Sequence, residues 1–319
     1  MRLGVAPLSD QRNRVWRGVL WLAVFYSPLT WPVTSELSVV ATGVYALIGD
    51  SGEVSLQNRG AVGNAGFIVG DRGVIVVDTG ISYRYGKAML ANIEGVTPLP
   101  IELAIISHPI QEFLFGAAAF QERNIPILAH QKTAELMRNR CAVCLKNLRR
   151  LLGEEEMLGS SVVVPNRLVE QSLRLSAGGR DLELLYFGWA STPGDLAVFD
   201  RASGVLFAGG LVSVGRIPEL RDADLRGWIG ALRQLEKLPI KWVIPGHGPV
   251  STGEQITQTL NYLATLEAKV RALYKKGVGL TDTIAQAQLP DFASWNLYAV
   301  IHPQNVQHVY LRLENEDFN

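Results

Sequence analysis

The chain has 319 residues, of which 48% are hydrophobic and 19% are charged, with 30 basic and 30 acidic side chains. A charged fraction below the ~25% of ordinary soluble chains excludes disorder as the main state. A formal net charge of zero gives no basic excess for contacting phosphates, which argues against nucleic acid as a partner. No apolar run approaches the ~18 residues of a membrane-spanning helix. The composition is that of a neutral globular protein with a large core and only five histidines.

The first 35 residues differ in pattern from the rest of the chain. Four arginines precede an apolar run at residues 18–26, and Ser27-Pro28 ends that run. This is the layout of a secretory signal, although residues 33–35 match the small-x-small cleavage pattern only loosely. We expect residues 1–35 to direct export, so that the protein is periplasmic or secreted, and residues 36–319 to form the folded domain. An uncleaved membrane anchor or a buried N-terminal helix is the alternative.

The elements predicted after this segment alternate between strands and helices. Segments rich in β-branched residues predict strands at residues 43–48, 64–69, 74–77, 103–106 and 125–129. Helical patterns follow at residues 83–93, 113–123 and 133–156. The second half repeats the theme, with strands predicted at residues 173–175, 182–187, 196–199, 205–208 and 242–244. A helix at residues 222–237 and further helices in the C-terminal third complete the pattern. We expect one α/β domain with helices outside packed sheets.

The two cysteines, Cys141 and Cys144, lie within the third predicted helix. A four-ligand zinc site would need a second pair. An oxidising compartment would permit a small disulfide. A redox-active pair would favour a strand-to-helix context, which is lacking here, so we expect a structural role.

Five short motifs occur where predicted strands end. They are VVDTG at residues 76–80, IISH at residues 105–108, STPGD at residues 191–195, LFAGG at residues 206–210 and VIPGHGP at residues 243–249. In this order and spacing they resemble the metallo-β-lactamase fold superfamily, from about residue 39 to the C-terminus. NAGFIVGDRGVIVVDTG, GRIPEL and HPQNVQHVYLRLE resemble the exported quinoprotein relay system zinc metallohydrolases of that superfamily. The resemblance implies a four-layer αββα sandwich with a zinc site at one edge of the sheets.

The resemblance also implies which positions would hold zinc, which generates hydroxide by lowering the pKa of bound water. The first histidine of the family's main motif is kept as His108, and the histidine of the late turn is kept as His247. The aspartate of the main motif is replaced by Glu112. The other four ligand positions have lost their donors and are occupied by Ile110, Phe113, Ser191 and Gly210.

For several polar residues, a structural role is an alternative to a role in the metal site. Asp78 is expected to cap the backbone of its loop, in support of the site. His108 could instead be a core histidine bonded to a backbone carbonyl. Ser191 could form a turn with its own Thr-Pro-Gly segment. His130 is expected to cap a helix, and His302 to begin one.

We therefore expect an exported protein that retains the fold, has lost most metal ligands, and acts as a non-catalytic binding or accessory protein. Ile110 and Phe113 would help to make the former site an apolar pocket for a small molecule or a periplasmic protein. No cofactor is expected, or zinc if any. The alternative is a hydrolase with one zinc ion bound by His108 and His247, with Glu112 as ligand or general base. A purely structural accessory role in a periplasmic quinoprotein system is a third hypothesis.

Overall fold

The computed structural model describes residues 1, 4 and 36–317, so the predicted export segment falls almost entirely outside the described residues. Within the described part, one sheet has the strand order β1-β2-β3-β4-β5-β6-β7. Its strands are β1 (Leu37–Ala41), β2 (Val44–Leu47), β3 (Ala65–Val69), β4 (Val74–Val77), β5 (Ile101–Ile106), β6 (Ile127–His130) and β7 (Arg167–Val169). The second sheet has the order β12-β11-β10-β9-β8. Its strands are β8 (Leu173–Ala177), β9 (Arg180–Leu185), β10 (Ala197–Asp200), β11 (Val205–Ser213) and β12 (Trp242–His247).

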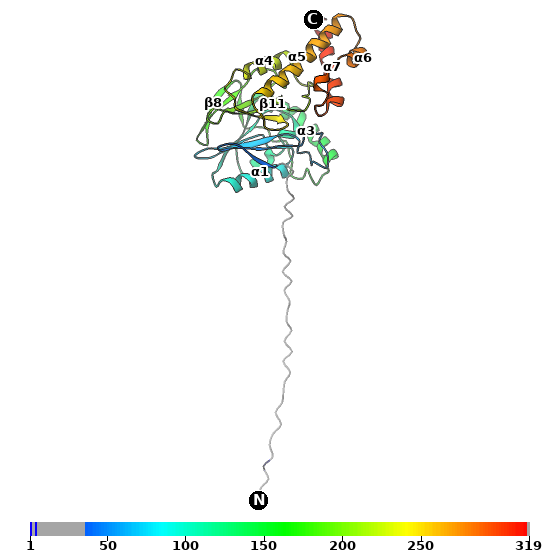
Figure 1. Cartoon of the computed structure of the whole chain (residues 1–319). Helices are drawn as coiled ribbons and strands as arrows, with labels where there is room; N and C mark the ends of the chain where they lie inside the picture. Colours follow the sequence, from blue (N-terminus) through cyan, green and yellow to red (C-terminus); the bar gives the residue numbers. More distant parts are fainter. Residues whose placement is uncertain (2–3, 5–35, 318–319) are drawn as a thin grey trace. The chain divides into compact units, whose positions relative to one another are not determined.

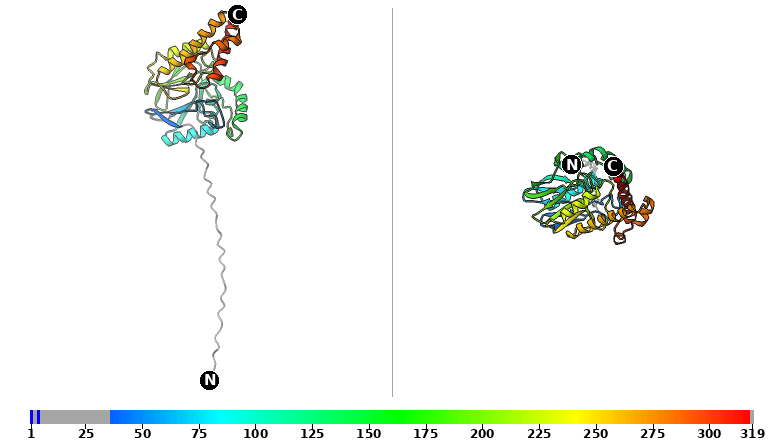
Figure 2. Two further views of the ribbon diagram at one scale, coloured as in Figure 1. Left: turned by 45° about the vertical axis from the view of Figure 1, so that its right-hand side comes forward. Right: turned by 90° about the horizontal axis from the view of Figure 1, so that it is seen from above.

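Helices cover the outer faces of the two sheets, as Figures 1 and 2 show. Those packed on the first sheet are α1 (Tyr83–Val96), α2 (Ala117–Glu122) and α3 (Gln131–Leu152). Those over the second sheet are α4 (Leu225–Leu235), α5 (Glu254–Lys275), α6 (Leu280–Gln286) and α7 (Tyr298–Asp317). The short 3-10 turns η1 (Gln111–Phe113) and η2 (Pro290–Phe292) complete the described elements. The predicted αββα sandwich is confirmed.

Side-chain alternation explains why both faces of the sheets are buried. In β4, Val74 and Val76 point to the helices, whereas Ile75 and Val77 join the core between the two sheets. A strand apolar on both faces is stable only with a layer on each side, which is the four-layer arrangement. None of the helices among residues 36–317 is long and apolar enough to cross a bilayer.

The helix predicted at residues 113–123 is wrong in its first turn. The chain forms η1, then turns at Gly116 before α2 begins. A Cβ at Gly116 would lie 1.9 Å from the Thr79 carbonyl oxygen, so only glycine allows this contact between the two loops. Thr79 N–H donates to the Phe113 carbonyl at 2.8 Å. These contacts fix η1, which carries two of the predicted site positions, at the end of β4.

Candidate functional site

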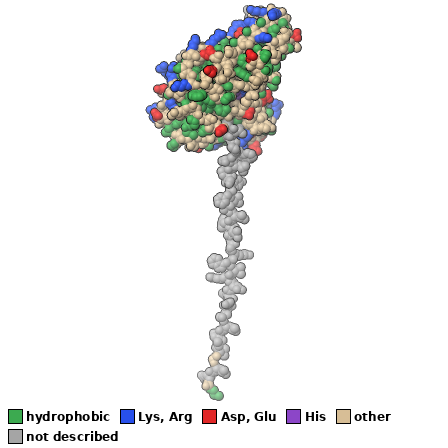
Figure 3. Space-filling view, viewed as in Figure 1, with side chains coloured by type: hydrophobic (Ala, Val, Ile, Leu, Met, Phe, Trp, Pro, Cys, Tyr) green, Lys and Arg blue, Asp and Glu red, His purple; other side chains and the backbone are tan. Residues whose placement is uncertain are grey.

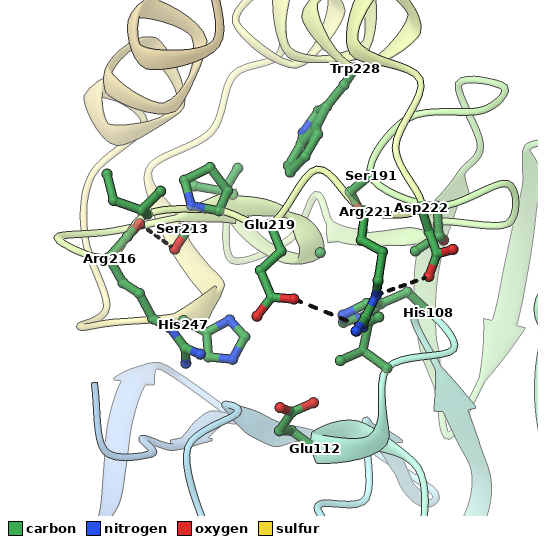
Figure 4. Close-up of a pocket in the computed structure, with 16 residues that line it drawn as sticks. His108, Glu112, Ser191, Ser213, Arg216, Glu219, Arg221, Asp222, Trp228 and His247 are labelled. Atoms are coloured by element: carbon green, nitrogen blue, oxygen red, sulfur yellow. Dashed lines mark hydrogen bonds and ion pairs between the residues drawn. The ribbon is translucent and has the colours of Figure 1, made fainter. Parts of the chain in front are cut away.

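The predicted site residues follow strands that run parallel in pairs. β4 pairs with β5, and β11 pairs with β12, in parallel. Because the carboxyl ends of parallel strands meet at one edge of a sheet, side chains that follow these strands come together. His108 comes two residues after β5, and His247 ends β12. Both border one cavity together with Glu112 of η1 (Figure 4).

His108 is oriented by hydrogen bonds that begin at Asp78. The two carboxylate oxygens of Asp78 accept from the backbone N–H of Ser107 at 2.8 Å and from its hydroxyl at 2.7 Å. The Ser107 Oγ lies 2.7 Å from His108 Nδ1. Because the hydroxyl proton goes to Asp78, Ser107 accepts from Nδ1–H, and Nε2 of His108 carries the free lone pair. Asp78 thus caps the loop after β5 and not its own loop, and His108 bonds a hydroxyl and not a backbone carbonyl.

Burial sets the charge of these groups. It lowers the pKa of His108 to about 3, so the imidazole is neutral at physiological pH. Burial raises the pKa of Asp78 to about 7, against the opposing effect of the two hydrogen bonds from Ser107. The site edge is therefore a low-dielectric environment in which an unpaired charge is costly.

Phe113 packs against both retained histidines. Its ring centroid lies 4.3 Å from that of His108 and 5.3 Å from that of His247. The side chain is fully buried and does not line the cavity. The expectation that Phe113 lines an apolar pocket is wrong, because its ring packs beneath the cavity against Gly63. Ile110 does line the cavity.

The described donors do not fit a catalytic zinc site. Such a site takes three protein ligands. Residues 36–317 contain no group of three His, Cys, Asp or Glu side chains that could hold a metal ion. At Gly210, a Cβ would lie 2.5 Å from Ser191 Oγ and 2.9 Å from His108 Cδ2. Ser191 and His108 thus occupy the space beside Gly210, and a carboxylate side chain would not fit there.

The cavity has a volume of about 70 Å³. Within the described structure, three buried polar atoms on its walls have no hydrogen-bond partner: Glu112 Oε2, Arg216 Nη1 and His247 Nε2. Buried polar groups are almost always paired, because each unpaired group costs about 1–3 kcal/mol and a charged group costs more. Three such atoms on one cavity wall indicate a place for a polar ligand.

Burial also dominates the protonation of these three groups. It raises the pKa of Glu112, with the negative charge of Glu219 adding to the effect. It lowers the pKa of His247 well below the usual value, and the positive charge of Arg216 acts in the same direction. Arg216 keeps its charge, since a guanidinium is not deprotonated in proteins. The cavity therefore presents one buried cation beside a neutral imidazole.

Arg216 is the residue that the sequence analysis missed, although its segment was noted in the resemblance. The arginine follows β11, is only 5% exposed, and points toward His247 in Figure 4. The same segment adds Glu219 and Arg221 to the cavity wall, where an ion pair of 3.9 Å joins them. The signal available in the sequence was the group of charged residues, Arg216, Glu219 and Arg221, shortly after a largely apolar strand.

The other predicted polar positions have structural partners. Ser191 donates to the Asp195 carboxylate at 2.8 Å instead of forming a turn with its own segment, and it lines the cavity. His130 caps α3 as predicted, accepting from the Lys132 N–H at 3.2 Å. The expectation that His302 begins a helix is wrong, because it lies inside α7, fully buried, 3.1 Å from the Tyr262 hydroxyl.

The comparisons with known proteins agree with the fold. The family model described as Metallo-beta-lactamase superfamily matches residues 58–247. The chain belongs to this superfamily. No protein with a curated description matches it.

Solved structures with the same fold share little sequence with the chain. A metallo-beta-lactamase from Pontibacter korlensis is 20% identical with a TM-score of 0.60, the match covering 72% of this chain and 99% of that one. The sec-alkylsulfatase Pisa1 from Pseudomonas sp. is 20% identical with a TM-score of 0.69, over 87% of this chain but 50% of that one. The DIM-1 metallo-beta-lactamase is 17% identical with a TM-score of 0.58, over 72% of this chain and 97% of that one. At these identities the matches show the fold alone.

Proposed function

We propose that this protein is a non-catalytic binding protein whose cavity takes a small molecule bearing a carboxylate. The observation that carries the proposal is the set of three partnerless buried atoms, one each on Glu112, Arg216 and His247. A carboxylate matches the fork of a guanidinium and would neutralise the buried cation. A hydroxyl beside it could donate to His247 or Glu112. The small volume favours short hydroxy acids.

Thermal unfolding with short carboxylic acids tests this proposal. A ligand at a hundred times its Kd stabilises the folded state by about 2.7 kcal/mol, so the best acid should raise Tm by several degrees. Arg216→Gln should abolish the rise, because it removes the buried cation of the cavity wall. Arg174→Gln, at a side chain 84% exposed on β8, is the control and should respond like the wild type. An equal response in Arg216→Gln, or none to any acid, contradicts the proposal.

Metal content separates this proposal from the zinc hydrolase alternative. We expect protein purified without chelators to carry zinc well below one ion per chain, because residues 36–317 hold no group of three donor side chains and Phe113 packs against both retained histidines. Stoichiometric zinc would overturn the non-catalytic assignment. In that case Glu112→Gln and His247→Ala should each abolish hydrolysis of an ester, thioester or lactam.

We also propose that the protein is exported and serves a periplasmic quinoprotein system. The support is the signal-like pattern of residues 1–35 and the resemblance of the GRIPEL and C-terminal segments to exported proteins. Cell fractionation with N-terminal sequencing tests export, and a cytoplasmic full-length chain contradicts it. Affinity capture from periplasm tests the partner, and failure to recover any quinoprotein contradicts that part.

A further inference from the structure

A second cavity adjoins the first beside α3. It has a volume of about 600 Å³ and shares Glu112 and Arg221 with the smaller cavity. Its wall from α3 includes Arg140 and Cys144. Cys144 is half-buried, so a small molecule in this groove can reach its sulfur.

The second thiol of the chain stands behind the first. Cys141 lies three residues earlier on α3, on the same face of the helix, and is only 1% exposed. Both cysteines are free thiols, and the Cys144 sulfur lies 3.5 Å from the Arg140 carbonyl oxygen, to which its S–H donates. One thiol is thus accessible from the groove and the other is screened from it.

The surroundings distinguish the two thiols chemically. A hydrogen bond from Cys141 lowers the pKa of Cys144 to about 7, and the Arg221 guanidinium acts in the same direction. Burial and the Glu112 carboxylate oppose this lowering. The same hydrogen bond and burial raise the pKa of Cys141. Because the thiolate is the nucleophile, Cys144 is the thiol that attacks first.

We propose that Cys144 and Cys141 form a thiol–disulfide exchange site for small disulfides that enter the groove, with Cys144 attacking and Cys141 resolving. The proposal does not depend on which ligand the smaller cavity binds, although the two cavities share Glu112 and Arg221. It replaces the structural role expected from the sequence.

The exchange balances without any further reactant. The Cys144 thiolate attacks one sulfur of a small disulfide, forming a mixed disulfide and releasing one small thiolate, which takes up the proton lost by Cys144. Cys141 then loses its proton and attacks the Cys144 sulfur, releasing the second small thiol. The protein ends as the Cys141–Cys144 disulfide, oxidised by two electrons, and the small disulfide ends as two reduced thiols.

Helix geometry makes the intramolecular disulfide easy to reopen. Residues three apart on a helix have Cβ atoms about 5–6 Å apart. A relaxed disulfide needs about 3.5–4.5 Å between them, so closure must distort α3. Strained disulfides are more oxidising than structural ones, and this favours exchange over a permanent crosslink.

Mass spectrometry of the reduced full-length protein with oxidised glutathione tests the site. The wild type should lose two hydrogens and retain no glutathione. Cys141→Ser should accumulate one glutathione on Cys144, because the resolving thiol is gone. Cys144→Ser should react at least about tenfold more slowly, because Cys141 is buried. Ala142→Ser, an exposed change on α3 outside the groove that keeps both thiols, should behave like the wild type.

Three outcomes would overturn the proposal. They are a stable glutathione adduct on the wild type, equal rates for Cys141→Ser and Cys144→Ser, and loss of both wild-type thiols only when the protein unfolds. Circular dichroism establishes whether each variant folds. If a variant does not fold, rapid quenching and digestion of the wild type must still place the first adduct on Cys144 and not on Cys141.

Discussion

Around Gly210, neighbouring side chains occupy the space that a side chain would need. Ser191 Oγ would lie 2.5 Å from a Cβ at this position, and it is held there by its bond to Asp195. His108 closes the other side and is itself fixed through Ser107. Each of these contacts is satisfied without a metal ion. The neighbouring side chains therefore fill the space at the lost metal-ligand position. Restoring a ligand side chain at Gly210 would cost stability.

Gly210→Ala should lower the free energy of unfolding by about 1–3 kcal/mol, because the new methyl group collides with two fixed side chains. The matched control is Gly230→Ala on α4, where a Cβ would meet no atom within 4 Å. That change should stabilise the protein by about 0.4–1 kcal/mol, through helix propensity and lower entropy of the unfolded chain. Urea unfolding measures both, and equal effects of the two substitutions would disprove the steric argument.

Asp195 should make stability depend on pH. Burial raises its pKa from 3.8 to about 6, against hydrogen bonds from Ser191 and Thr192. The folded state then binds this proton more tightly than the unfolded state. The free energy of unfolding should therefore fall as pH rises from about 4 to about 6, by about 3 kcal/mol from this group.

Urea unfolding across this pH range for the wild type and Asp195→Asn measures that contribution. The variant should have a shallower slope over the same range, whatever its absolute stability. Asp78 contributes in the same direction to both proteins and cancels in the difference. Parallel slopes for the two proteins would show that Asp195 keeps an ordinary pKa in the folded state.

At the scale of elements, α7 positions the segment that carries Arg216. Asn305 of α7 accepts from the Leu220 N–H at 3.0 Å and donates to the Pro218 carbonyl at 2.7 Å. The Ile217 N–H donates to the Asn296 carbonyl at 3.1 Å, just before α7 begins. The C-terminal helices thus fix one wall of the cavity, although Asn305 lies 85 residues after Leu220 in sequence.

Asn305→Ala should lower the free energy of unfolding by about 1–3 kcal/mol, because it leaves buried backbone groups unpaired. It should also speed hydrogen exchange at the Leu220 amide and weaken carboxylate binding, since Arg216 loses its support. Gln304→Ala, an exposed change on the same helix, should alter stability by no more than about 0.5 kcal/mol. Unchanged exchange at Leu220 would mean that the loop is rigid without α7.

At the scale of the whole molecule, the core between the sheets joins both halves of residues 36–317. Ile75 and Val77 of the first sheet share this core with Val198 and Phe207 of the second. Neither sheet can lose its partner without exposing this apolar layer. On the face shown in Figure 3, basic, acidic and apolar side chains are interspersed, in keeping with the balanced charge.

The shared core predicts a single unfolding transition. Tryptophan fluorescence reports mainly on the second half, whereas far-UV circular dichroism reports on all elements. The two signals should give the same midpoint in urea, because the inter-sheet layer couples the halves. Separate midpoints would show that the sheets unfold independently.

Much of the fold could be predicted because its determinants are local. The continuous apolar run of β4 and the motif VVDTG define a buried strand and its turn without any knowledge of the partner strands. Gly116 and His302 were misassigned because their roles depend on contacts with distant residues. The close approach of the Thr79 carbonyl oxygen leaves no room for a Cβ at Gly116. The Tyr262 hydroxyl lies within hydrogen-bond distance of His302, which is buried in the core.

The same distinction applies to the site. The sequence by itself determined the sandwich and the loss of donors at Ile110, Phe113, Ser191 and Gly210, because motif flanks and residue identities are readable along the chain. Only the tertiary structure decided that charged groups wall the cavity, that a buried nitrogen of Arg216 has no hydrogen-bond partner, and that Phe113 packs against both histidines. Burial and pairing depend on chain segments brought together from both sheets and α7, and no local pattern encodes them.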